Sequence, residues 1–295
     1  MTCAHFGGVL GAASLGCVDR DLVMALVPGG ILVALIGFLD DHGHVNPFLR
    51  LVVHLLALSF ALVWIGEWRW PGFGWGADGL RQMWPPLLLL LLAWFLNLFN
   101  FMDGIDGIAG SQALFMALGG ALLSGLGGAG VDDVAPLILL AAAAAGFLVW
   151  NCPPARIFMG DVGSGYLGYA LGVVALWTVV QGWLSPWVWA ILGGAFIADA
   201  TTTLVVRALA RVRVTEAHRS HAYQRLSRHW RGHGRVTMAF SAINIGWLAP
   251  WAFVAARWPS AGAECAAISV LPLFLLALKL GAGRAGEIGG QARSE

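Results

Sequence analysis

Long runs of apolar residues, separated by short polar segments, constrain this chain more than any other feature of its sequence. Charged residues make up only 11% of the 295 residues, whereas soluble domains carry about 25%. Ten apolar runs of roughly 13–20 residues occur, against the roughly 20 that a helix needs to cross the hydrocarbon core of a bilayer. They lie at about Phe6–Val18, Leu22–Leu39, Phe48–Ile65, Met83–Asn100, Ile108–Leu126, Val134–Trp150, Val162–Val180, Trp183–Ala200, Thr237–Ala256 and Ala266–Leu280. We therefore expect an all-α, polytopic integral membrane protein with about ten transmembrane helices, forming a single domain over residues 1–295.

The arginines predict which ends of these helices face the cytoplasm. Eight of the 17 basic residues lie between Arg207 and Arg235, and loops rich in Arg and Lys stay on the cytoplasmic side. If each apolar run crosses once, three further loops share that side: Asp40–Arg50, Phe101–Gly107 and Asn151–Asp161. Their Asp, Asn and Arg side chains would then form one cytoplasmic surface.

Paired carboxylates occur in two of these loops. Asp40 and Asp41 lie at the end of the second apolar run, and Arg50 follows them. Asp103 and Asp106 lie three residues apart in the string MDGIDG, where each is followed by a glycine that permits a tight turn. Hard cations such as Mg²⁺ prefer oxygen ligands, so either pair could hold a metal ion. A solvated helix end and a polar turn that caps the next helix are the structural alternatives.

The segment from Asn151 to Gly165 combines features of a phosphate site and a metal site. Asp161, two glycines and a serine begin the seventh apolar run, and the free N–H groups at a helix N-terminus bind phosphate. Asp161 suits this position if it holds a Mg²⁺ ion that bridges the phosphates. As a structural alternative, Asp161 caps the helix. Phe158 could stack on a base or anchor the membrane interface.

The arginine-rich loop contains the string HRSH. Arg219 matches phosphate geometry by bidentate hydrogen bonding, and His218 and His221 share a face if the segment is helical. The structural alternative is positive charge that only sets the topology. Asp199 is a carboxylate near the end of the eighth apolar run, which makes it a functional candidate unless it pairs with Arg207.

Four strings, in this order, resemble the polyprenyl-phosphate N-acetylhexosamine-1-phosphate transferases: the Asp-Asp pair, NLFNFMDGIDGIAG, NCPPARIFMGDVGSGYLG and HRSHAYQRL. That superfamily includes the enzyme that makes the first lipid intermediate of peptidoglycan and the enzymes that initiate O-antigen. The resemblance extends from about Phe6 to Arg235. It implies transfer of an N-acetylhexosamine 1-phosphate (GlcNAc, FucNAc or QuiNAc type) from a UDP-sugar to undecaprenyl phosphate. UMP is released, and O-antigen or another cell-envelope glycan is started.

The resemblance also implies roles for individual residues. Asp161 is the expected ligand of Mg²⁺, for which Mn²⁺ could substitute. Asp40 and Asp41 are expected to form a catalytic or metal-proximal pair, and Asn100, Asp103 and Asp106 to line the nucleotide and metal pocket. Asn151 and Phe158 are expected to hold the uracil, and Arg50 to bind substrate. The diphosphate and sugar are expected to contact His218, Arg219 and His221. One-step attack and a covalent aspartyl-phosphate route both remain open.

Two features bear on substrate and activity. The string HRSH lacks the consecutive histidines of the peptidoglycan enzyme and is similar to the O-antigen-initiating branch, which disfavours a MurNAc-pentapeptide substrate. The family's extra first helix and its PTPRGGG-like loop are expected to be missing, since only His5–Gly8 resembles the end of that loop. An inactive family member that binds lipid phosphate as a scaffold is therefore an alternative. A membrane transporter is another, disfavoured because transporters place key charges near the bilayer midplane.

The expected partners follow from the same resemblance. They are a UDP-N-acetylhexosamine, undecaprenyl phosphate, the lipid bilayer and a second copy of the chain in a homodimer, with no nucleic acid. The expected location is the bacterial inner (plasma) membrane, with the active site of the multi-pass protein facing the cytoplasm.

Overall fold

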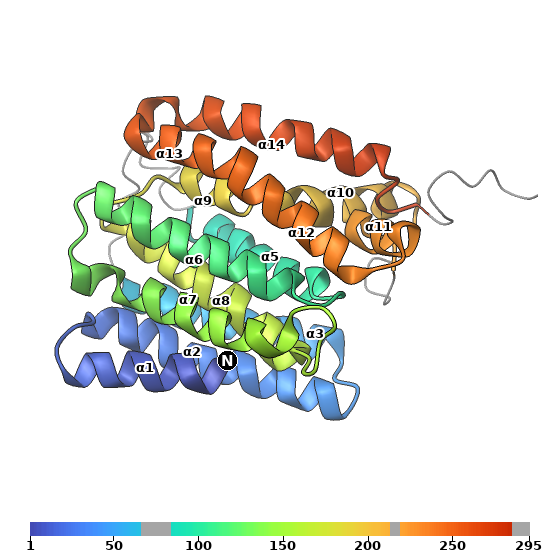
Figure 1. Ribbon diagram of the computed structural model, residues 1–295. Coiled ribbons are helices and arrows are strands. Elements are labelled where there is room, and N and C mark those ends of the chain that lie inside the picture. The colour runs from blue at the N-terminus through green and yellow to red at the C-terminus, as the bar shows by residue number, and fades with distance from the viewer. Residues whose placement is uncertain (66–83, 213–218, 285–295) are drawn as a thin grey trace, which may run out of the picture.

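The computed structural model describes residues 1–65, 84–212 and 219–284, and within these ranges the regular secondary structure is helical throughout. The long helices lie side by side in a bundle (Figure 1). In chain order they are α1 (Thr2–Ser14), α2 (Arg20–His42), α3 (Pro47–Ile65), α5 (Trp84–Met102), α6 (Ile108–Leu126), α7 (Val131–Asn151), α8 (Gly160–Val180), α9 (Pro186–Leu192), α10 (Gly194–Leu209), α11 (Ala222–Trp230), α12 (His233–Ile243), η1 (Asn244–Leu248), α13 (Ala249–Arg257), η2 (Pro259–Ala261) and α14 (Gly262–Lys279). The all-α fold predicted from the apolar runs is confirmed.

Seven helices of the described chain are long and apolar enough to cross a bilayer. They are α2, α3, α6, α7, α8, the continuous run His233–Arg257 and the run Pro259–Lys279. Each has 19–25 residues, and a helix of about 20 residues spans the roughly 30 Å of the hydrocarbon core. The pair α9 and α10 is an eighth candidate, bent by 76° between its two helices.

The prediction of about ten crossings is not confirmed by the part of the chain that the structure describes. The first apolar run corresponds to α1, which has 13 residues, and the apolar part of α5 is the shorter helix Pro86–Met102. The run Trp183–Ala200, predicted as one crossing, is divided between α9 and α10, because the chain bends where Gly193 separates them.

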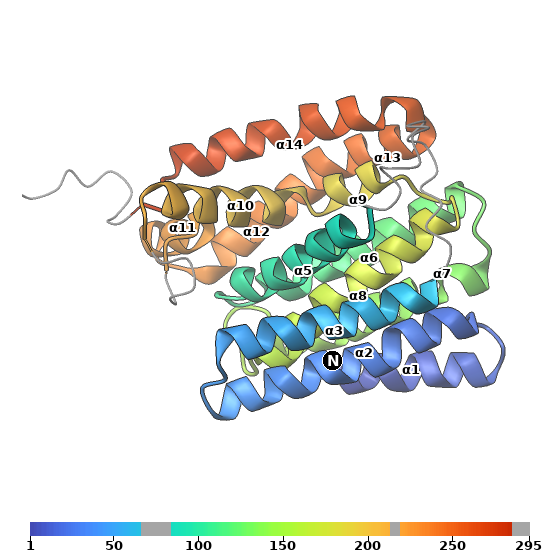
Figure 2. The same ribbon diagram turned by 180° about the vertical axis from the view of Figure 1, so that it is seen from behind.

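Helix α8 lies at the centre of the bundle because its small residues let neighbouring backbones approach closely. Figure 2 shows it between the α2–α3 pair and α5, and 89% of its apolar window is buried. A Cβ atom on Gly168 would lie 2.7 Å from the backbone of Leu96 in α5, and one on Gly37 of α2 would lie 2.6 Å from the backbone of Asp161. Gly168 therefore lets α8 pack closely against α5, and Gly37 lets α2 approach the beginning of α8.

Two buried tyrosines of α8 show how polar side chains inside the bundle pair with each other or with helix carbonyls, which an apolar surrounding favours. The hydroxyl of Tyr169 donates to the carbonyl of Ala25 at 2.5 Å. Nδ1 of His5 lies 2.5 Å from the hydroxyl of Tyr166. His5, predicted to resemble the end of a loop, thus lies within α1 and ties that helix to α8.

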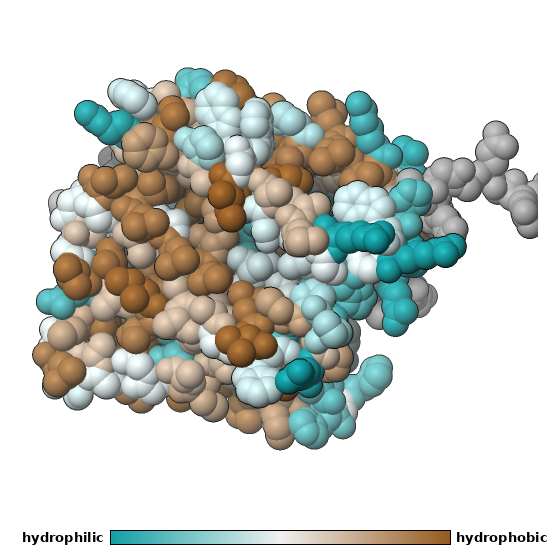
Figure 3. All heavy atoms as spheres, viewed as in Figure 1, coloured by the Kyte–Doolittle hydropathy of each residue, from teal (hydrophilic) through white to brown (hydrophobic). Residues whose placement is uncertain are grey.

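The surface of the bundle has an apolar flank and a polar end. Figure 3 shows hydrophobic side chains spread along the helices, and hydrophilic side chains gathered at the end where α11 lies in Figure 1. The apolar flank fits the hydrocarbon of a bilayer, so the polar end is where water-soluble molecules can reach the protein.

Candidate active site

Four carboxylates gather at the polar end, where helices that are distant in sequence begin or end. Asp40 and Asp41 lie in the last turn of α2, Asp103 follows α5 directly, and Asp161 lies in the first turn of α8. We call these four residues the carboxylate cluster. Arg50, in the first turn of α3, joins them. The counting of crossings had predicted that these loops share one face, and the structure brings them together.

The guanidinium of Arg50 links two members of the cluster. Its Nη1 donates to Oδ2 of Asp161 at 2.8 Å and also to Oδ2 of Asp40. The other oxygen of Asp40 accepts from the backbone N–H of Val45 at 3.0 Å. The side chains of Arg50 and Asp40 are 21% and 17% exposed, so this ion pair is partly shielded from water, and removing either partner would leave the other charge uncompensated there.

The amide of Asn100 holds the other side of Asp161. Its Nδ2 donates to Oδ1 of Asp161 at 2.8 Å and lies 3.1 Å from the hydroxyl oxygen of Ser164, one turn further along α8. Both oxygens of Asp161 therefore accept hydrogen bonds, one from Asn100 and one from Arg50. Asn100 was a predicted site residue, and its contact with Asp161 gives it a defined position.

Asp41 caps α8 from outside that helix. Its carboxylate accepts from the backbone N–H groups of Asp161 at 2.9 Å and Val162 at 3.3 Å, which are free at a helix N-terminus. Gly160 makes this approach possible, because its φ of +65° suits glycine and an added Cβ would lie 2.5 Å from Oδ2 of Asp41. This cap fixes the position of the Asp161 backbone.

Asp103 has the least support within the cluster. It is half-buried, and its carboxylate makes no hydrogen bond or ion pair among the described residues. Burial, with repulsion from Asp161 and Asp41, raises the pKa of Asp103 to about 7. A cation that binds nearby would favour the ionised form of this carboxyl group.

The cluster suits a cation that brings further ligands with it. Four carboxylates face one guanidinium, which leaves an excess of negative charge. Among the described residues no three His, Cys, Asp or Glu side chains form a ready-made metal cage. Mg²⁺ commonly binds one or two protein carboxylates and takes its other ligands from water and substrate phosphates. The residues present fit such a site, in which Asp161 would be the central oxygen ligand, with Asp40 and Asp103 beside it.

Asp106 and Asn151 connect loops beside the cluster. Asp106 accepts from the backbone N–H of Ala155 at 3.1 Å, and its Oδ1 lies 3.0 Å from Nδ1 of His233. Asn151, which is 4% exposed, accepts from Gly107 at 2.9 Å and donates to the carbonyl of Ile157 at 2.8 Å. Their catalytic and uracil-binding roles stay predictions. The contacts show that both residues join the α5–α6 loop to the α7–α8 loop.

The remaining predicted residues divide between surface, interior and an undescribed segment. Phe158 is 79% exposed in the α7–α8 loop, and its stacking role stays a prediction. Arg219 is also exposed. His221 is 2% exposed, and its Nδ1 lies 3.3 Å from Oδ1 of Asp199. His218 lies outside the described residues.

A cleft of about 690 Å³ opens beside the cluster. One part of its wall is polar, with Arg50, Asn100, Asp103, Asp161 and His221. Another part is apolar and includes Leu51, Leu90, Ala93, Trp94 and Leu204. Leu90 precedes Asn100 by about ten residues in α5, which is about 15 Å along a helix. The cleft therefore leads from the carboxylates along the apolar flank of the bundle.

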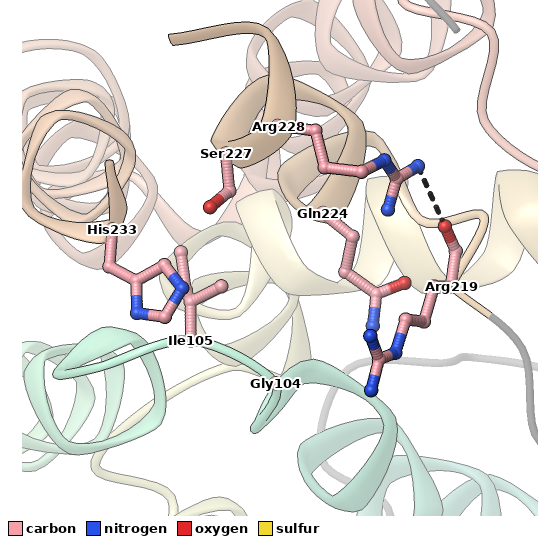
Figure 4. A pocket seen from close by; sticks show the side chains of 7 residues that line it. All are labelled: Gly104, Ile105, Arg219, Gln224, Ser227, Arg228 and His233. Atoms are coloured by element: carbon pink, nitrogen blue, oxygen red, sulfur yellow. Dashed lines mark hydrogen bonds between the residues drawn. The ribbon is translucent and has the colours of Figure 1, made fainter. Parts of the chain in front are cut away.

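A second hollow, of about 760 Å³, adjoins the first and is basic. Figure 4 shows Arg219 and Gln224 projecting into it from one side and His233 facing Ile105 on the other. Nη2 of Arg228 donates to the carbonyl of Arg219 at 2.9 Å. Gly104 and Gln224 line both hollows, so the two are neighbours. We call this hollow the basic pocket.

Sequence reasoning missed several residues of this end. His233 pairs with Asp106 from about 130 residues further along the chain, and Ser164 contacts Asn100. Gln224 lies between the two hollows. Ser164 and Gln224 belong to strings that had been singled out, but a string alone does not reveal which side chain points into a cleft. His233 had no such signal.

Comparison with known proteins shows to which family the chain belongs. Residues 23–179 match the model of the family described as Glycosyl transferase family 4. The chain is 34% identical over 187 residues to the phospho-N-acetylmuramoyl-pentapeptide-transferase of Moorella thermoacetica, which covers 58% of this chain and 57% of that protein. It is 27% identical over 232 residues to a probable undecaprenyl-phosphate N-acetylglucosaminyl 1-phosphate transferase of Bacillus subtilis, covering 75% and 62%. The match thus spans about six tenths of the length of each relative.

Proposed function

The chain belongs to glycosyl transferase family 4, and on that premise we propose that it transfers a sugar 1-phosphate from a UDP-sugar to a polyprenyl phosphate. The observation that carries the proposal is the cleft with two kinds of wall. Carboxylates, an arginine and an asparagine line its polar part, and its apolar part extends along the flank of the bundle. A molecule with a phosphate head and a long hydrocarbon tail matches this combination.

The acceptor phosphate would lie near Arg50. The guanidinium of Arg50 already contacts Asp40 and Asp161, and arginine binds phosphate oxygens through parallel hydrogen bonds. The prenyl chain would follow Leu51, Leu90 and Trp94 along the cleft, where burial of each CH₂ group contributes about 0.8 kcal/mol. This arrangement brings a lipid phosphate to the carboxylate cluster without lifting its tail out of the membrane.

The donor would lie across both hollows. Its diphosphate carries negative charge, and Arg219, Arg228 and His233 line the basic pocket. Gln224, which borders both hollows, lies where the two substrates would meet. We propose that the basic pocket receives the UMP part and that the sugar 1-phosphate points toward Asp103 and Asp161.

We propose that Mg²⁺, or Mn²⁺ in its place, binds at Asp161 with Asp40 and Asp103 beside it. Bound there, the ion would neutralise charge on the diphosphate oxygens. Hydrogen bonds from Asn100 and the capping contacts of Asp41 hold Asp161 in position for this task. The carboxylate cluster carries more negative charge than Arg50 can balance, and this excess supports the binding of a divalent cation.

The reaction exchanges one phosphate linkage for another. An oxygen of the lipid phosphate bonds to the β-phosphorus of the donor, and the bond from that phosphorus to the bridging oxygen breaks, so UMP leaves with the oxygen. A phosphate monoester is already anionic near neutral pH, so the chain need not remove a proton from it. Asp40 and Asp41 then serve to hold Arg50 and the α8 N-terminus in place.

We propose an N-acetylhexosamine of GlcNAc, FucNAc or QuiNAc type as the sugar, and O-antigen or another envelope glycan as the product pathway. The HRSH string and the similarity to the probable N-acetylglucosaminyl transferase favour it. A MurNAc-pentapeptide donor is the second candidate, because the protein from Moorella thermoacetica bears that name. We also propose a bacterial inner-membrane location with the polar end in the cytoplasm, since Arg219 and Arg228 of the arginine-rich loop line the basic pocket there.

The test is UMP release by the purified protein. It is offered undecaprenyl phosphate and each of UDP-GlcNAc, UDP-FucNAc, UDP-QuiNAc and UDP-MurNAc-pentapeptide, with Mg²⁺, with Mn²⁺ or with a chelator. Release that needs both the lipid and the cation, with one N-acetylhexosamine donor preferred, is the expected result. A preference for UDP-MurNAc-pentapeptide would replace the first candidate by the second. No release from any donor, while lipid phosphate still binds, would support the inactive scaffold.

A further inference from the structure

Asp199 is a buried carboxylate that the proposed reaction does not use. It lies in α10 and is 2% exposed. Its Oδ1 accepts from the backbone N–H of Ala222 at 2.9 Å, and its Oδ2 accepts from the backbone N–H of Tyr223 at 2.8 Å. The hydroxyl of Thr203 donates to Oδ1 at 3.2 Å. Asp199 therefore caps the N-terminus of α11 from a neighbouring helix.

Two backbone donors explain why a carboxylate is needed at this position. An asparagine has one oxygen and one NH₂ group, so in either orientation its NH₂ group would face a backbone N–H of α11. One of the two N–H groups would be left unpaired in a buried place, which costs about 1–3 kcal/mol. The substitution Asp199→Asn therefore changes hydrogen bonding while nearly preserving shape.

The same carboxylate contacts a residue of the cleft. Nδ1 of His221 lies 3.3 Å from Oδ1 of Asp199. The imidazole is 2% exposed, its ring stacks against Phe101 with centroids 6.4 Å apart, and His221 lines the cleft beside Asp103. A carboxylate oxygen can only accept, so the proton must be on Nδ1 of His221.

We propose that Asp199 is a positioning residue, which anchors α11 and fixes the neutral His221 ring as the Nδ1–H tautomer. Nε2 is then the unprotonated nitrogen of that ring, an acceptor rather than a donor of hydrogen bonds. An Asp that orients a His in this way also stabilises the imidazolium when it forms. The tautomer itself follows from the geometry alone, and only its effect on turnover rests on the proposed function.

The first measurement is nitrogen NMR of the full chain, labelled with ¹⁵N-histidine and free of substrate. The signals of His221 are assigned by their loss in His221→Gln, at a pH where its imidazole is neutral. We expect a protonated Nδ1 and an unprotonated Nε2 in the wild type. A wild-type ring protonated on Nε2 would overturn the proposal, whatever the variants do.

Two variants separate positioning from general stability. Asp199→Asn is expected to lose the pure Nδ1–H signature and to lower UMP release about 10²-fold, the scale expected of a misplaced group. Thr203→Val removes a hydrogen bond to the same oxygen but leaves both the cap and the His221 contact, so it should keep the signature and most of the activity. An unchanged signature in folded Asp199→Asn would overturn the proposal. If no UMP is released even by the wild type, the proposed function fails while the tautomer result still stands.

Discussion

Asp103 is the member of the carboxylate cluster whose charge the folded protein disfavours most visibly. Its pKa rises from 3.8 to about 7 through burial and the repulsion of Asp161 and Asp41. Between about pH 4 and about pH 7, Asp103 is therefore protonated in the folded state but ionised in the unfolded chain. Stability must fall as the pH rises through that window, because the native state binds more protons there.

We predict that Asp103→Asn raises the melting temperature above about pH 7 and has little effect below about pH 4, measured in detergent with a chelator present. The amide cannot ionise, so the repulsion disappears. Asp132→Asn, an exposed carboxylate at the other end of the bundle, is the matched control and should show no such pH dependence. Equal stabilities of Asp103→Asn and wild type at all pH values would contradict the pKa assigned to Asp103.

Arg50 gives a second prediction at this scale. Arg50→Gln should lower the free energy of unfolding by about 1–3 kcal/mol, because the Asp40 and Asp161 carboxylates lose their shared cation while partly buried. Millimolar Mg²⁺ should restore more stability to this variant than to the wild type. Thermal unfolding with and without Mg²⁺ checks both points, and Arg20→Gln at the opposite end of α2 is the control. A Mg²⁺ effect that is the same in all three proteins would argue against a cation at the cluster.

Which residues meet at the site could largely be predicted, but what each one does there could not. Asp40, Asp161 and Asn100 were selected from their strings, and they lie together. Asp106 and Asn151 came from the same strings and instead join two loops. A string records which residues are near a turn, whereas the direction of a side chain depends on packing between helices far apart in sequence.

At the scale of the helices, the contact between α2 and α8 positions the cluster. A Cβ on Gly37 would lie 2.6 Å from the backbone of Asp161, so even the smallest side chain must push the beginning of α8 away from Asp41. We predict that Gly37→Ala lowers stability by about 1–3 kcal/mol through overpacking and reduces UMP release.

The control for this prediction is Gly146→Ala in α7, since a Cβ there would meet nothing within 4 Å. It should behave as the wild type in both thermal unfolding and UMP release. If Gly37→Ala and Gly146→Ala proved equally harmless, the close approach of α2 and α8 would not be what holds Asp161 in place.

Helix positions follow from the length of the apolar runs, and each predicted run overlaps a helix of the structure. The bend between α9 and α10 was not predicted, because the run Trp183–Ala200 is apolar enough overall to be taken as one crossing. Its signal is the pair Gly193-Gly194, where residues without side chains leave the backbone free to change direction. Hydropathy detects that a segment is buried in lipid, not whether it is straight.

At the scale of the whole molecule, the account requires the polar end to face the cytoplasm. Cys152 is exposed in the α7–α8 loop at that end, and Cys17 lies at the opposite end. In single-cysteine variants, a membrane-impermeant maleimide should label Cys152 in inside-out vesicles and Cys17 in spheroplasts. Labelling of Cys152 from the outside would reverse the proposed orientation and separate the site from cytoplasmic UDP-sugars.

Membership of the transferase family, predicted from four strings, is confirmed by the family match over residues 23–179. The choice of sugar stays a prediction, because the named relatives include both MurNAc-pentapeptide and N-acetylglucosaminyl transferases. In the proposed arrangement the four strings surround the diphosphate that all candidate donors share, whereas a few contacts outside the strings would distinguish one sugar from another.

The most direct test of the central claim compares UMP release by Asp161→Asn and Asp132→Asn, each offered undecaprenyl phosphate, the preferred UDP-sugar and Mg²⁺. Both variants lose one carboxylate, but only Asp161 belongs to the cluster. The account predicts that Asp161→Asn stays folded at the assay temperature yet releases UMP at least about 10²-fold more slowly, while Asp132→Asn keeps the wild-type rate. Lipid-dependent UMP release by Asp161→Asn at the wild-type rate would contradict the claim that the carboxylate cluster is the active site.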